Sequence, residues 1–555
     1  MQEVKVTLPS KHGFNVPYGT RVGEIMREEE FLAISDRIVG AYVNNEVTSL
    51  SFKVEVNAHI RPVTLDSTDG ARIYRRSLCF ILTVASVELF PERRLVIGHS
   101  LGDSYYYHYD GFDRIEERDL EKIEERMRLL IKENLPIQRR VLSYTDAIAF
   151  LQSTGRQTSA QLLGHRNESK VPVYECRSFC DISHGPLVPE TGVLRNFELL
   201  GYPPGFLLRY PAPESPGTIK PFVNQPVVFS IFQEYKSWGK ILGVSSAGQL
   251  NELVRSGKMD DFIRVAEALH DRKIAEIADK IRSRKESVRL VLIAGPSSSG
   301  KTTFTKKLEI QLRVLGFLPV SLSTDDYFLP RELTPKDEKG DYDFESISAL
   351  DIEGLNTDLN DLLAGGEVEI PNFDFKTGRR KTPGRGKRLQ LEDRSLILIE
   401  GIHGLNPALT AEVPKEQTFK VYVSALSQLN IDDHNRIPTT DLRLIRRIVR
   451  DRQFRGYSAL DTLSRWPSVK RGENRDIFPF EGNADVAFNS ALDYELPILK
   501  PFVEPLLGTV KPQDEVYSET LRIVAFLKNF VGIPQGLVPP YSILREFIGG
   551  SGFKY

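Results

Sequence analysis

Nine consecutive residues, GPSSSGKTT, combine small side chains, a lysine and hydroxyls in the way that proteins use to hold phosphate. The first eight fit the pattern G-x-x-x-x-G-K-[ST]. Its glycines let backbone N–H groups turn toward phosphate oxygens, and the start of a following helix adds partial positive charge. We predict that this phosphate loop binds a nucleoside triphosphate. Its residues are Gly295, Pro296, Ser297, Ser298, Ser299, Gly300, Lys301, Thr302 and Thr303.

The flanking sequence supplies the setting that this chemistry requires. The apolar run VRLVLIA before the loop predicts a buried strand, and TTFTKKLEIQLRVLG after it predicts a helix closed by Gly316. The alternative is a chance glycine-rich turn, but such a turn seldom lies between a buried strand and a capped helix. In this setting Lys301 would bridge the β- and γ-phosphates and Thr302 would ligate Mg²⁺. ATP and Mg²⁺ are therefore the predicted cofactors.

Carboxylates follow two further strand-like segments. LPVSLST ends at Asp325 and Asp326, and RSLILIEG carries Glu400 near its end. In an open parallel sheet the carboxyl ends of the strands border one crevice, so these acids would lie beside the phosphate loop. A carboxylate there can accept a proton from an attacking hydroxyl or hold Mg²⁺. A single such acid would be better explained as a turn or cap residue, but two strands that deliver acids favour chemistry.

A cluster of arginines lies further along the chain, in DLRLIRRIVRDRQFRG. Guanidinium groups match phosphate oxygens and stabilise negative charge in a transition state, and a hinged lid that carried them would exclude water. A solvated basic helix or an RNA-binding patch is the alternative, which flanking aspartates and sparse aromatic residues disfavour. The cluster consists of Arg443, Arg446, Arg447, Arg450, Arg452 and Arg455.

Composition describes an ordinary globular protein of several domains. The chain has 555 residues, of which 41% are hydrophobic and 27% charged, and its net charge of −2 lacks the excess of a general nucleic-acid binder. Three cysteines cannot form a disulfide framework. The N-terminus lacks the apolar core of a signal peptide, and no apolar run reaches the roughly 20 residues of a membrane span. We expect a cytoplasmic protein with no membrane contact.

Changes of pattern divide the chain into five segments. Alternating apolar residues predict a small mixed domain first, and the proline-rich stretch GYPPGFLLRYPAPESPGTIKPFVNQP predicts a domain boundary or stiff connector. Helical periodicity follows, and then the strand–loop–helix pattern of the phosphate loop. The predicted boundaries are 1–66, 67–215, 216–286 (linker and helical connector), 287–535 and 536–555 (a C-terminal tail).

Five ordered motifs across roughly residues 288–500 resemble the uridine kinase and phosphoribulokinase group: STDDYF, DYDFESISALD, PNFDFKTGRR, LILIEGI and RRIVRD…RG. The resemblance implies a P-loop NTPase fold with a doubly wound parallel sheet and ATP-dependent phosphoryl transfer to a hydroxyl. It places the proton acceptor on Asp325 and a substrate-sugar aspartate on Asp343. Asp326 is the alternative base if the preceding strand ends one residue later. The predicted metal ligands are then Thr302, Asp325 and Glu400. The lid arginines fall on Arg447, Arg450 and Arg455, so these and Lys301 join Asp325 as predicted catalytic residues.

Departures from the group concern the substrate. An aromatic hydroxyl and a histidine that read the pyrimidine in uridine kinases correspond here to Phe373 and Gly378, and a substrate-side arginine corresponds to Tyr457. Loss of such hydrogen-bonding groups removes the discrimination that they supplied. The acceptor is predicted to be a nucleoside or another small alcohol bound near Asp343, Phe373 and Tyr457. The basic segment TPGRGKR (382–388) is either an exposed hairpin or a mobile loop near the acceptor.

The N-terminal segments resemble threonyl-tRNA synthetases. VKVTLP and VNNEV are typical of the small ubiquitin-like TGS domain. DSTDGARIYRRSLCFILTVASVELFP, IGHSLGDSYYYHYD and CDISHGPLVPETG follow the order of the second additional domain, an α+β editing module. The four metal-type ligands of that module fall on Arg76, Phe80, Ser183 and Leu187, which cannot hold zinc or polarise a water. We expect the scaffold without zinc and without its hydrolytic chemistry. Three nearby histidines do not match the ligand positions: His99, His108 and His184.

The complete chain is therefore expected to be an α/β multidomain protein and a kinase of nucleoside-like small molecules. A nucleotide-binding regulator whose N-terminal module contacts tRNA or other RNA is the alternative from a different class. A third hypothesis is that this module senses a ligand and regulates the kinase.

Overall fold

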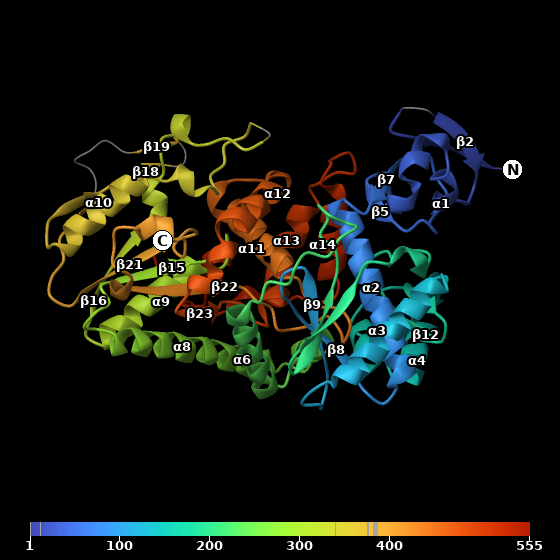
Figure 1. Cartoon of the computed structure of the whole chain (residues 1–555), viewed down its shortest axis with the longest axis horizontal. Helices are drawn as coiled ribbons and strands as arrows, with labels where there is room; N and C mark the ends of the chain where they lie inside the picture. Colours follow the sequence, from blue (N-terminus) through green and yellow to red (C-terminus); the bar gives the residue numbers. More distant parts are fainter. Residues whose placement is uncertain (1, 11–12, 339, 375–376, 381–386, 555) are drawn as a thin grey trace.

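The structure is a computed structural model that describes residues 2–10, 13–338, 340–374, 377–380 and 387–554. The N-terminal domains and the C-terminal α/β domain lie at opposite ends (Figure 1). Between them lie helices α11 (Thr439–Arg450), α12 (Ala459–Asp476), α13 (Glu495–Leu507) and α14 (Tyr517–Leu527). Within the described residues, no helix combines the length and the apolar character needed to cross a membrane.

The first domain is a mixed five-stranded sheet in the order β2-β1-β7-β4-β5. Strands β1 and β7 are parallel and the other neighbours are antiparallel. Buried and exposed side chains alternate along β1, which is the pattern of a sheet with one face on a core. The elements are β1 (Glu3–Thr7), β2 (Gly13–Pro17), β3 (Thr20–Arg21), α1 (Val22–Ile25), β4 (Ile38–Val43), β5 (Glu46–Thr48), β6 (Lys53–Val54) and β7 (Ala58–Thr64).

The second domain packs helices against two antiparallel sheets, in the orders β13-β14-β9-β8 and β10-β11-β12. Its longest helix starts where Ser67 Oγ accepts a hydrogen bond from the backbone N–H of Gly70 (3.0 Å). The elements are α2 (Thr68–Leu89), β8 (Leu95–Ser100), β9 (Ser104–Tyr109), α3 (Glu117–Lys132), β10 (Gln138–Ser143), α4 (Tyr144–Ser153), α5 (Gln157–Leu163), β11 (Lys170–Cys176), β12 (Phe179–Ile182), β13 (Glu198–Tyr202) and β14 (Gly205–Arg209).

The start of the proline-rich stretch differs from the prediction of a boundary. It forms the β13–β14 hairpin, and β14 is a central strand between β13 and β9. Pro203 and Pro204 occupy the turn of this hairpin, where no N–H has to pair in the sheet. Proline density alone therefore indicated a connector where the chain makes a turn inside a sheet.

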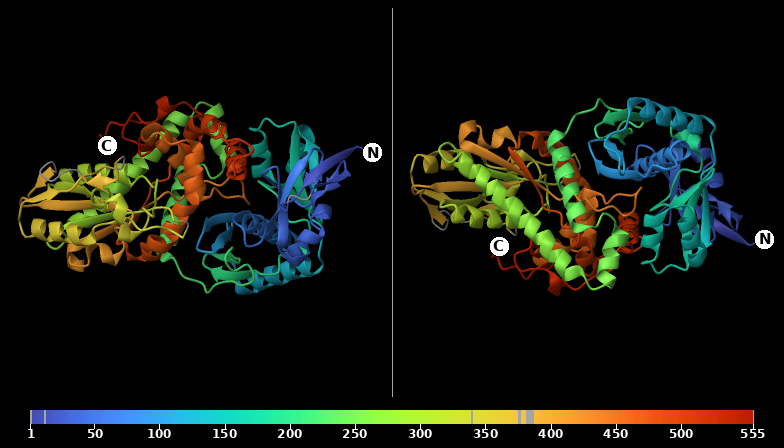
Figure 2. Two further views of the ribbon diagram at one scale, coloured as in Figure 1. Left: turned by 90° about the horizontal axis from the view of Figure 1, so that it is seen from above. Right: turned by 90° about the horizontal axis from the view of Figure 1, so that it is seen from below.

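Three helices form the connector: α6 (Pro226–Leu242), α7 (Ala247–Arg255) and α8 (Met259–Ser283). Helix α6 packs Phe229 and Phe232 against Tyr106 of the second domain, with ring centroids 5.2 and 5.7 Å away. Helix α8 runs along the outside of the C-terminal domain (Figure 2), where Lys307 of α9 pairs with Asp271 at 2.7 Å. The connector thus contacts both ends of the molecule.

The C-terminal domain is built on five parallel strands in the order β16-β21-β15-β22-β23, which confirms the predicted doubly wound sheet. The central strand β15 is buried along its whole length. The strands are β15 (Leu290–Ala294), β16 (Leu318–Ser323), β21 (Ser395–Gly401), β22 (Thr418–Ser424) and β23 (Val486–Asn489). Two short pairs lie outside this sheet: β17 (Val368–Ile370) with β20 (Lys387–Leu389), and β18 (Phe373–Asp374) with β19 (Arg379–Arg380).

Helices cover this sheet, and some of them lie between it and the N-terminal domains (Figure 1). They are α9 (Lys301–Val314), α10 (Ile352–Leu363), α11 (Thr439–Arg450), α12 (Ala459–Asp476), α13 (Glu495–Leu507), α14 (Tyr517–Leu527) and α15 (Arg545–Ile548). The segment predicted as a C-terminal tail packs into the same hydrophobic core through Ile543, Leu544 and Phe547. It is an integral part of this domain's packing.

A loop after β22 joins the second domain to the C-terminal domain. Arg94 pairs with Asp433 at 2.6 Å, Asp181 with His434 at 2.9 Å, and His184 with Asp432 at 3.1 Å. Because both ends of these contacts are anchored in separate cores, the contacts fix how the domains are placed.

The Asp181–His434 pair predicts a pH-dependent stability. Burial opposes both charges, but their hydrogen bond and mutual attraction raise the pKa of His434 and lower the pKa of Asp181; Asp432 and Asp433 add to the effect on His434. A raised histidine pKa stabilises the fold below about pH 6.5, and this stabilisation is lost as the pH rises through the folded-state pKa. We expect Tm to fall across that window.

The His434→Gln variant should show a flatter dependence of Tm on pH, measured by differential scanning fluorimetry from pH 6 to pH 9. His59→Gln, which changes an exposed histidine, is the matched control and should follow the wild-type curve. If the His434→Gln curve keeps the wild-type slope, the pair does not carry this dependence.

Candidate active site

The phosphate loop joins β15 to α9 with a backbone that only glycine permits at two points. A Cβ on Gly295 would lie 2.0 Å from the carbonyl oxygen of Val423, and Gly300 has φ +84°. The hydroxyls of Ser298 and Ser299 are buried and have no hydrogen-bond partner among the described residues. Buried hydroxyls of this kind fit a loop whose remaining partner is an anion.

Helices α11 and α12 hold the loop from one side. Arg443 Nε donates to the carbonyl oxygen of Ser297 (2.9 Å), and Arg447 Nη1 donates to its hydroxyl (2.9 Å). The backbone N–H of Ser297 donates to Glu473 Oε1 (3.1 Å), and Glu473 also pairs with Arg443. The guanidinium of Arg443 lies 5.4 Å from the ring centre of Trp466. Arg443 is therefore a buried structural residue that shapes the loop.

Arg446 has a similar structural position. Its Nε donates to Glu495 Oε2 (2.5 Å), and its Nη2 donates to the carbonyl oxygen of Ser490 (2.8 Å). Its side chain is fully buried. The arginine cluster thus has two roles. Arg443 and Arg446 are buried in contacts that support the phosphate loop, and the other arginines of the cluster remain for a ligand.

The lysine and the first threonine of α9 meet the acid of β21. Thr302 Oγ1 donates to Glu400 Oε1 (2.9 Å), and Lys301 Nζ donates to the carbonyl oxygen of Pro296 (3.2 Å). Burial raises the pKa of Glu400 to about 7, which the charge of Lys301 partly offsets. Burial lowers the pKa of Lys301, although Glu400 and Asp325 oppose this change.

Mg²⁺ at a phosphate loop takes oxygen ligands from one or two protein groups, from water and from phosphate. The hydrogen-bonded oxygens of Thr302 and Glu400 fit this requirement. Among the described residues, no group of three or more His, Cys, Asp or Glu side chains could hold a metal ion by protein ligands alone.

Asp325 follows β16 directly and faces the same group of charges. Its side chain is accessible to water, but the protein around it disfavours ionisation and raises its pKa, while Lys301, Arg455 and Arg450 lower it. Asp326 accepts a long hydrogen bond (3.5 Å) from Asn372 on another side. Of the two adjacent acids, Asp325 is therefore the one whose charge acts on Lys301.

The three predicted lid arginines surround one buried acid, Asp451. Arg447, Arg450 and Arg455 lie 3.4, 3.2 and 3.7 Å from its carboxylate oxygens. Helix α11 ends at Arg450, residues 451–455 form a π-helical turn, and Gly456 ends that turn with φ +73°. Burial and the charge of Arg455 lower the pKa of Arg450 to about 10. Such wide turns often mark functional sites.

The predicted substrate residues have partners of their own. Asp343 accepts a hydrogen bond from Arg475 Nη2 (2.8 Å), and the ring of Phe373 is buried 5.7 Å from that of Phe328. Tyr457 is 37% exposed, and Arg465 lies 4.4 Å over its ring. Their roles toward an acceptor remain predictions. Of the basic segment 382–388, only the last two residues belong to the described part of the chain.

Three acids at the loop were not foreseen: Glu345, Glu473 and Glu546. Glu546 Oε2 accepts hydrogen bonds from the backbone N–H (3.0 Å) and the hydroxyl (2.8 Å) of Thr303. Burial raises the pKa of Glu345 to about 7, and the neighbouring charge of Arg447 opposes this. Glu345 lies two residues after Asp343 in a motif already noted, but no local signal connects Glu473 or Glu546 with a loop more than 170 residues away.

The four positions predicted to correspond to metal-type ligands lie in the second domain. Arg76 Nη1 donates to the carbonyl oxygen of Pro186 (3.1 Å), and Ser183 Oγ donates to that of Gly185 (2.8 Å). Phe80 packs edge-on against Phe179 with ring centroids 5.1 Å apart. Leu187, the fourth position, is buried.

Comparison with known proteins divides the chain in the same way. Residues 290–496 match the model of the Phosphoribulokinase / Uridine kinase family. The solved "Structure of a Possible Uridine Kinase from Bacillus stearothermophilus" shares 19% identity over 38% of this chain and 100% of that chain, with a TM-score of 0.24.

The other similarity is to threonine–tRNA ligases. The chain is 35% identical over 161 residues to that of Carboxydothermus hydrogenoformans, which covers 29% of this chain and 25% of the relative. It is 32% identical over 201 residues to that of Thermotoga maritima, which covers 36% and 30%. The chain thus spans only about a quarter to a third of the length of these relatives. Both resemblances noted in the sequence are confirmed: residues 290–496 are a phosphoribulokinase/uridine kinase family domain, and the N-terminal region is homologous to threonine–tRNA ligases.

Proposed function

We propose that the protein transfers the γ-phosphoryl group of ATP, in a Mg²⁺-dependent reaction, to a hydroxyl of a small molecule of the nucleoside class. One observation carries the proposal. Within a domain of a kinase family, Lys301, the Thr302–Glu400 pair and Asp325 share one electrostatic environment at the phosphate loop.

Each residue would have a distinct part in the transfer. Lys301 and the arginines around Asp451 would stabilise the negative charge that spreads over the phosphoryl oxygens. Asp325 would orient the acceptor hydroxyl and take its proton, and its raised pKa makes it a better base than an ordinary aspartate. Mg²⁺, held through Thr302 and Glu400, would neutralise charge on the phosphate oxygens.

A panel of nucleosides and small sugar alcohols, each incubated with ATP and Mg²⁺, tests this proposal. We expect ADP release that depends on one acceptor class, together with a phosphorylated product detected by mass spectrometry. Nucleosides with different bases should differ little, because Phe373 and Gly378 offer no side-chain hydrogen bonds to a base. ADP release that is the same with and without every acceptor would contradict a small-molecule kinase.

Glu546 provides a further prediction for this site. Its carboxylate accepts hydrogen bonds from the donors of Thr303 at the start of α9, where an anionic phosphate would also bind. Removal of this competing charge should therefore strengthen nucleotide binding. We expect the Glu546→Ala variant to bind ATP at least about fivefold more tightly, because the phosphate no longer has to displace the carboxylate from its charge-assisted hydrogen bonds with Thr303.

Isothermal titration calorimetry of the full chain measures this change. Glu515→Ala, which removes an exposed glutamate elsewhere in the same domain, is the matched control. Weaker ATP binding in Glu546→Ala would show instead that the carboxylate supports the site.

A contact between residues 1–215 and tRNA is the second candidate function, and the identity with threonine–tRNA ligases supports it. Binding of tRNA to the full chain that weakens steeply with salt would favour this candidate. The absence of such binding at low salt would remove it.

A further inference from the structure

A large cavity lies between the N-terminal domains and the C-terminal domain. Its volume is about 1880 Å³, and residues of α2, β11, α12, α14 and the loop before α11 line it. Arg76, which replaces the first lost metal-type ligand, is one of these residues. The phosphate-loop lysine is not among them, so the cavity is separate from the proposed active site.

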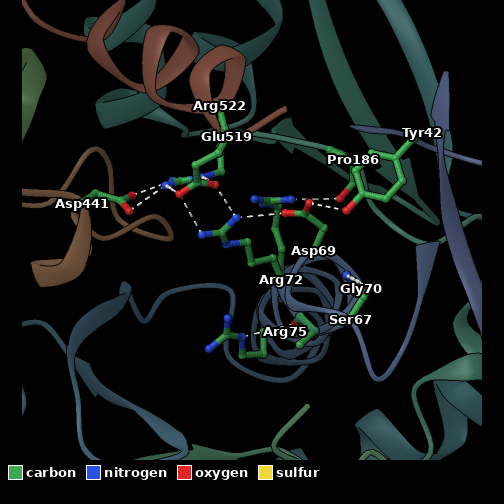
Figure 3. Close-up of polar contacts among 12 residues, drawn as sticks. Tyr42, Ser67, Asp69, Gly70, Arg72, Arg75, Pro186, Asp441, Glu519 and Arg522 are labelled. Atoms are coloured by element: carbon green, nitrogen blue, oxygen red, sulfur yellow. Dashed lines mark hydrogen bonds and ion pairs between the residues drawn. The ribbon is translucent and has the colours of Figure 1, made fainter. Parts of the chain in front are cut away.

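The acidic groups on one wall of the cavity are already paired. Arg72 contacts Asp69 at 2.9 Å and Glu519 at 2.6 Å, and Arg522 contacts Asp441 at 2.6 Å and Glu519 at 2.8 Å (Figure 3). These contacts join the second domain to α11 and α14. They also occupy the carboxylates of Asp69, Asp441 and Glu519.

Five further arginines that line the cavity have no carboxylate within ion-pair distance among the described residues: Arg21, Arg75, Arg76, Arg139 and Arg436. Three of them, Arg75, Arg76 and Arg436, come from α2 and from the loop before α11. Arg75 Nε donates to the carbonyl oxygen of Ala71 (3.2 Å), and its guanidinium lies 5.3 Å from the ring centre of Tyr210. Arg436 lies 5.5 Å over the ring of Tyr105 and contacts His99 Nδ1 at 3.3 Å.

For Arg76, the third, the hydrogen-bond partner within the described ranges is the carbonyl oxygen of Pro186. Burial and the nearby charges of Arg72 and Arg522 lower the pKa of Arg76, to about 10. Half-buried positive charge without a carboxylate partner is partly desolvated, so its natural complement is an anion.

The backbone makes room for Arg76. A Cβ on Gly185 would lie 2.6 Å from Arg76 Nη1, so any other residue at position 185 would displace the guanidinium. Gly185 also has φ +146°, which L side chains rarely adopt. Arg76 therefore fits closely against Gly185, at a position where the second additional domain of threonyl-tRNA synthetases would carry a metal ligand.

We propose that this cavity binds a phosphate-bearing small molecule of nucleotide size, whose phosphate oxygens contact Arg75, Arg76 and Arg436. Guanidinium forks match phosphate oxygens better than any other side chain does. Tyr105, Tyr174 and Tyr210 line the same space and offer hydroxyls and rings to the rest of the ligand. The volume exceeds the 300–1,000 Å³ of ordinary ligand pockets, so a nucleotide fits with its water.

Calorimetric titration of the full-length protein with a nucleoside 5′-monophosphate and with inorganic pyrophosphate tests this site. The Lys301→Ala background weakens phosphate binding at the phosphate loop. We expect binding to persist in that background and to weaken at least tenfold in Arg76→Met and in Arg436→Gln, which act from two different domains. Arg264→Gln, which changes an exposed arginine of α8, is the matched control and should bind as its parent does.

A stability measurement separates loss of a ligand contact from loss of fold. Because the half-buried charge of Arg76 has no carboxylate partner in the described part of the chain, Arg76→Met should unfold without ligand at the same temperature as its parent or at a higher one. Pyrophosphate should raise the Tm of the parent but not that of Arg76→Met.

Three results would overturn the proposal. They are no binding of either probe at millimolar concentration, binding that the Arg76 and Arg436 substitutions leave unchanged, and binding of a short single-stranded RNA without binding of the small probes. The last result would assign the cavity to a nucleic-acid backbone.

Discussion

Lys301→Ala is expected to reduce kcat/KM for acceptor-dependent ADP formation by about 10³-fold or more. The lysine begins α9, and the charges of Glu400 and Asp325 act on its ammonium group. An alanine there leaves the loop backbone intact but removes a charge that is needed most in the transition state. A coupled ADP assay with the best acceptor of the panel measures the loss.

Lys306→Ala is the matched control, because it removes a lysine from the same helix outside the loop. Its activity should stay close to that of the wild type. Thermal unfolding of both variants checks that the fold is retained. Turnover in Lys301→Ala within a factor of ten of the wild type would exclude the proposed phosphoryl-transfer site.

Asp325→Asn should lower kcat by about 10²–10⁴-fold while the affinity for ATP changes little. The amide keeps the size of the side chain but cannot take a proton from the acceptor hydroxyl. The effect should therefore appear in kcat, since it concerns the chemical step. Steady-state kinetics together with calorimetric ATP binding separate the two quantities.

Asp326→Asn decides between the two adjacent acids. Asp325 is among the charges that act on Lys301, whereas Asp326 accepts a hydrogen bond from Asn372. We therefore expect substitution of Asp326 to lower kcat by less than about tenfold. A larger loss in Asp326→Asn than in Asp325→Asn would transfer the role of base to Asp326. Equal activity of both variants and the wild type would exclude either carboxylate as the base.

The sequence alone identified the parts of the site that depend on short motifs and on the ends of neighbouring strands. The phosphate loop could be identified because its ligand contacts come from consecutive backbone N–H groups, so its glycines, lysine and hydroxyls have a fixed spacing. Asp325 and Glu400 could be placed beside the loop because parallel strands align their carboxyl ends, and the structure joins Thr302 to Glu400 as that rule requires. The two resemblances could be read from ordered motifs in the same way.

Only the tertiary structure decided which charges are available to a ligand. Arg443 and Arg447 occur in the same arginine run, yet Arg443 is buried in an ion pair with Glu473 while Arg447 reaches the loop hydroxyl. The position of Glu546 on Thr303 and the unpaired charge of Arg76 are likewise invisible in the sequence. Contacts between segments far apart in the chain leave no periodic pattern, because they depend on which surfaces pack together and not on spacing along the backbone.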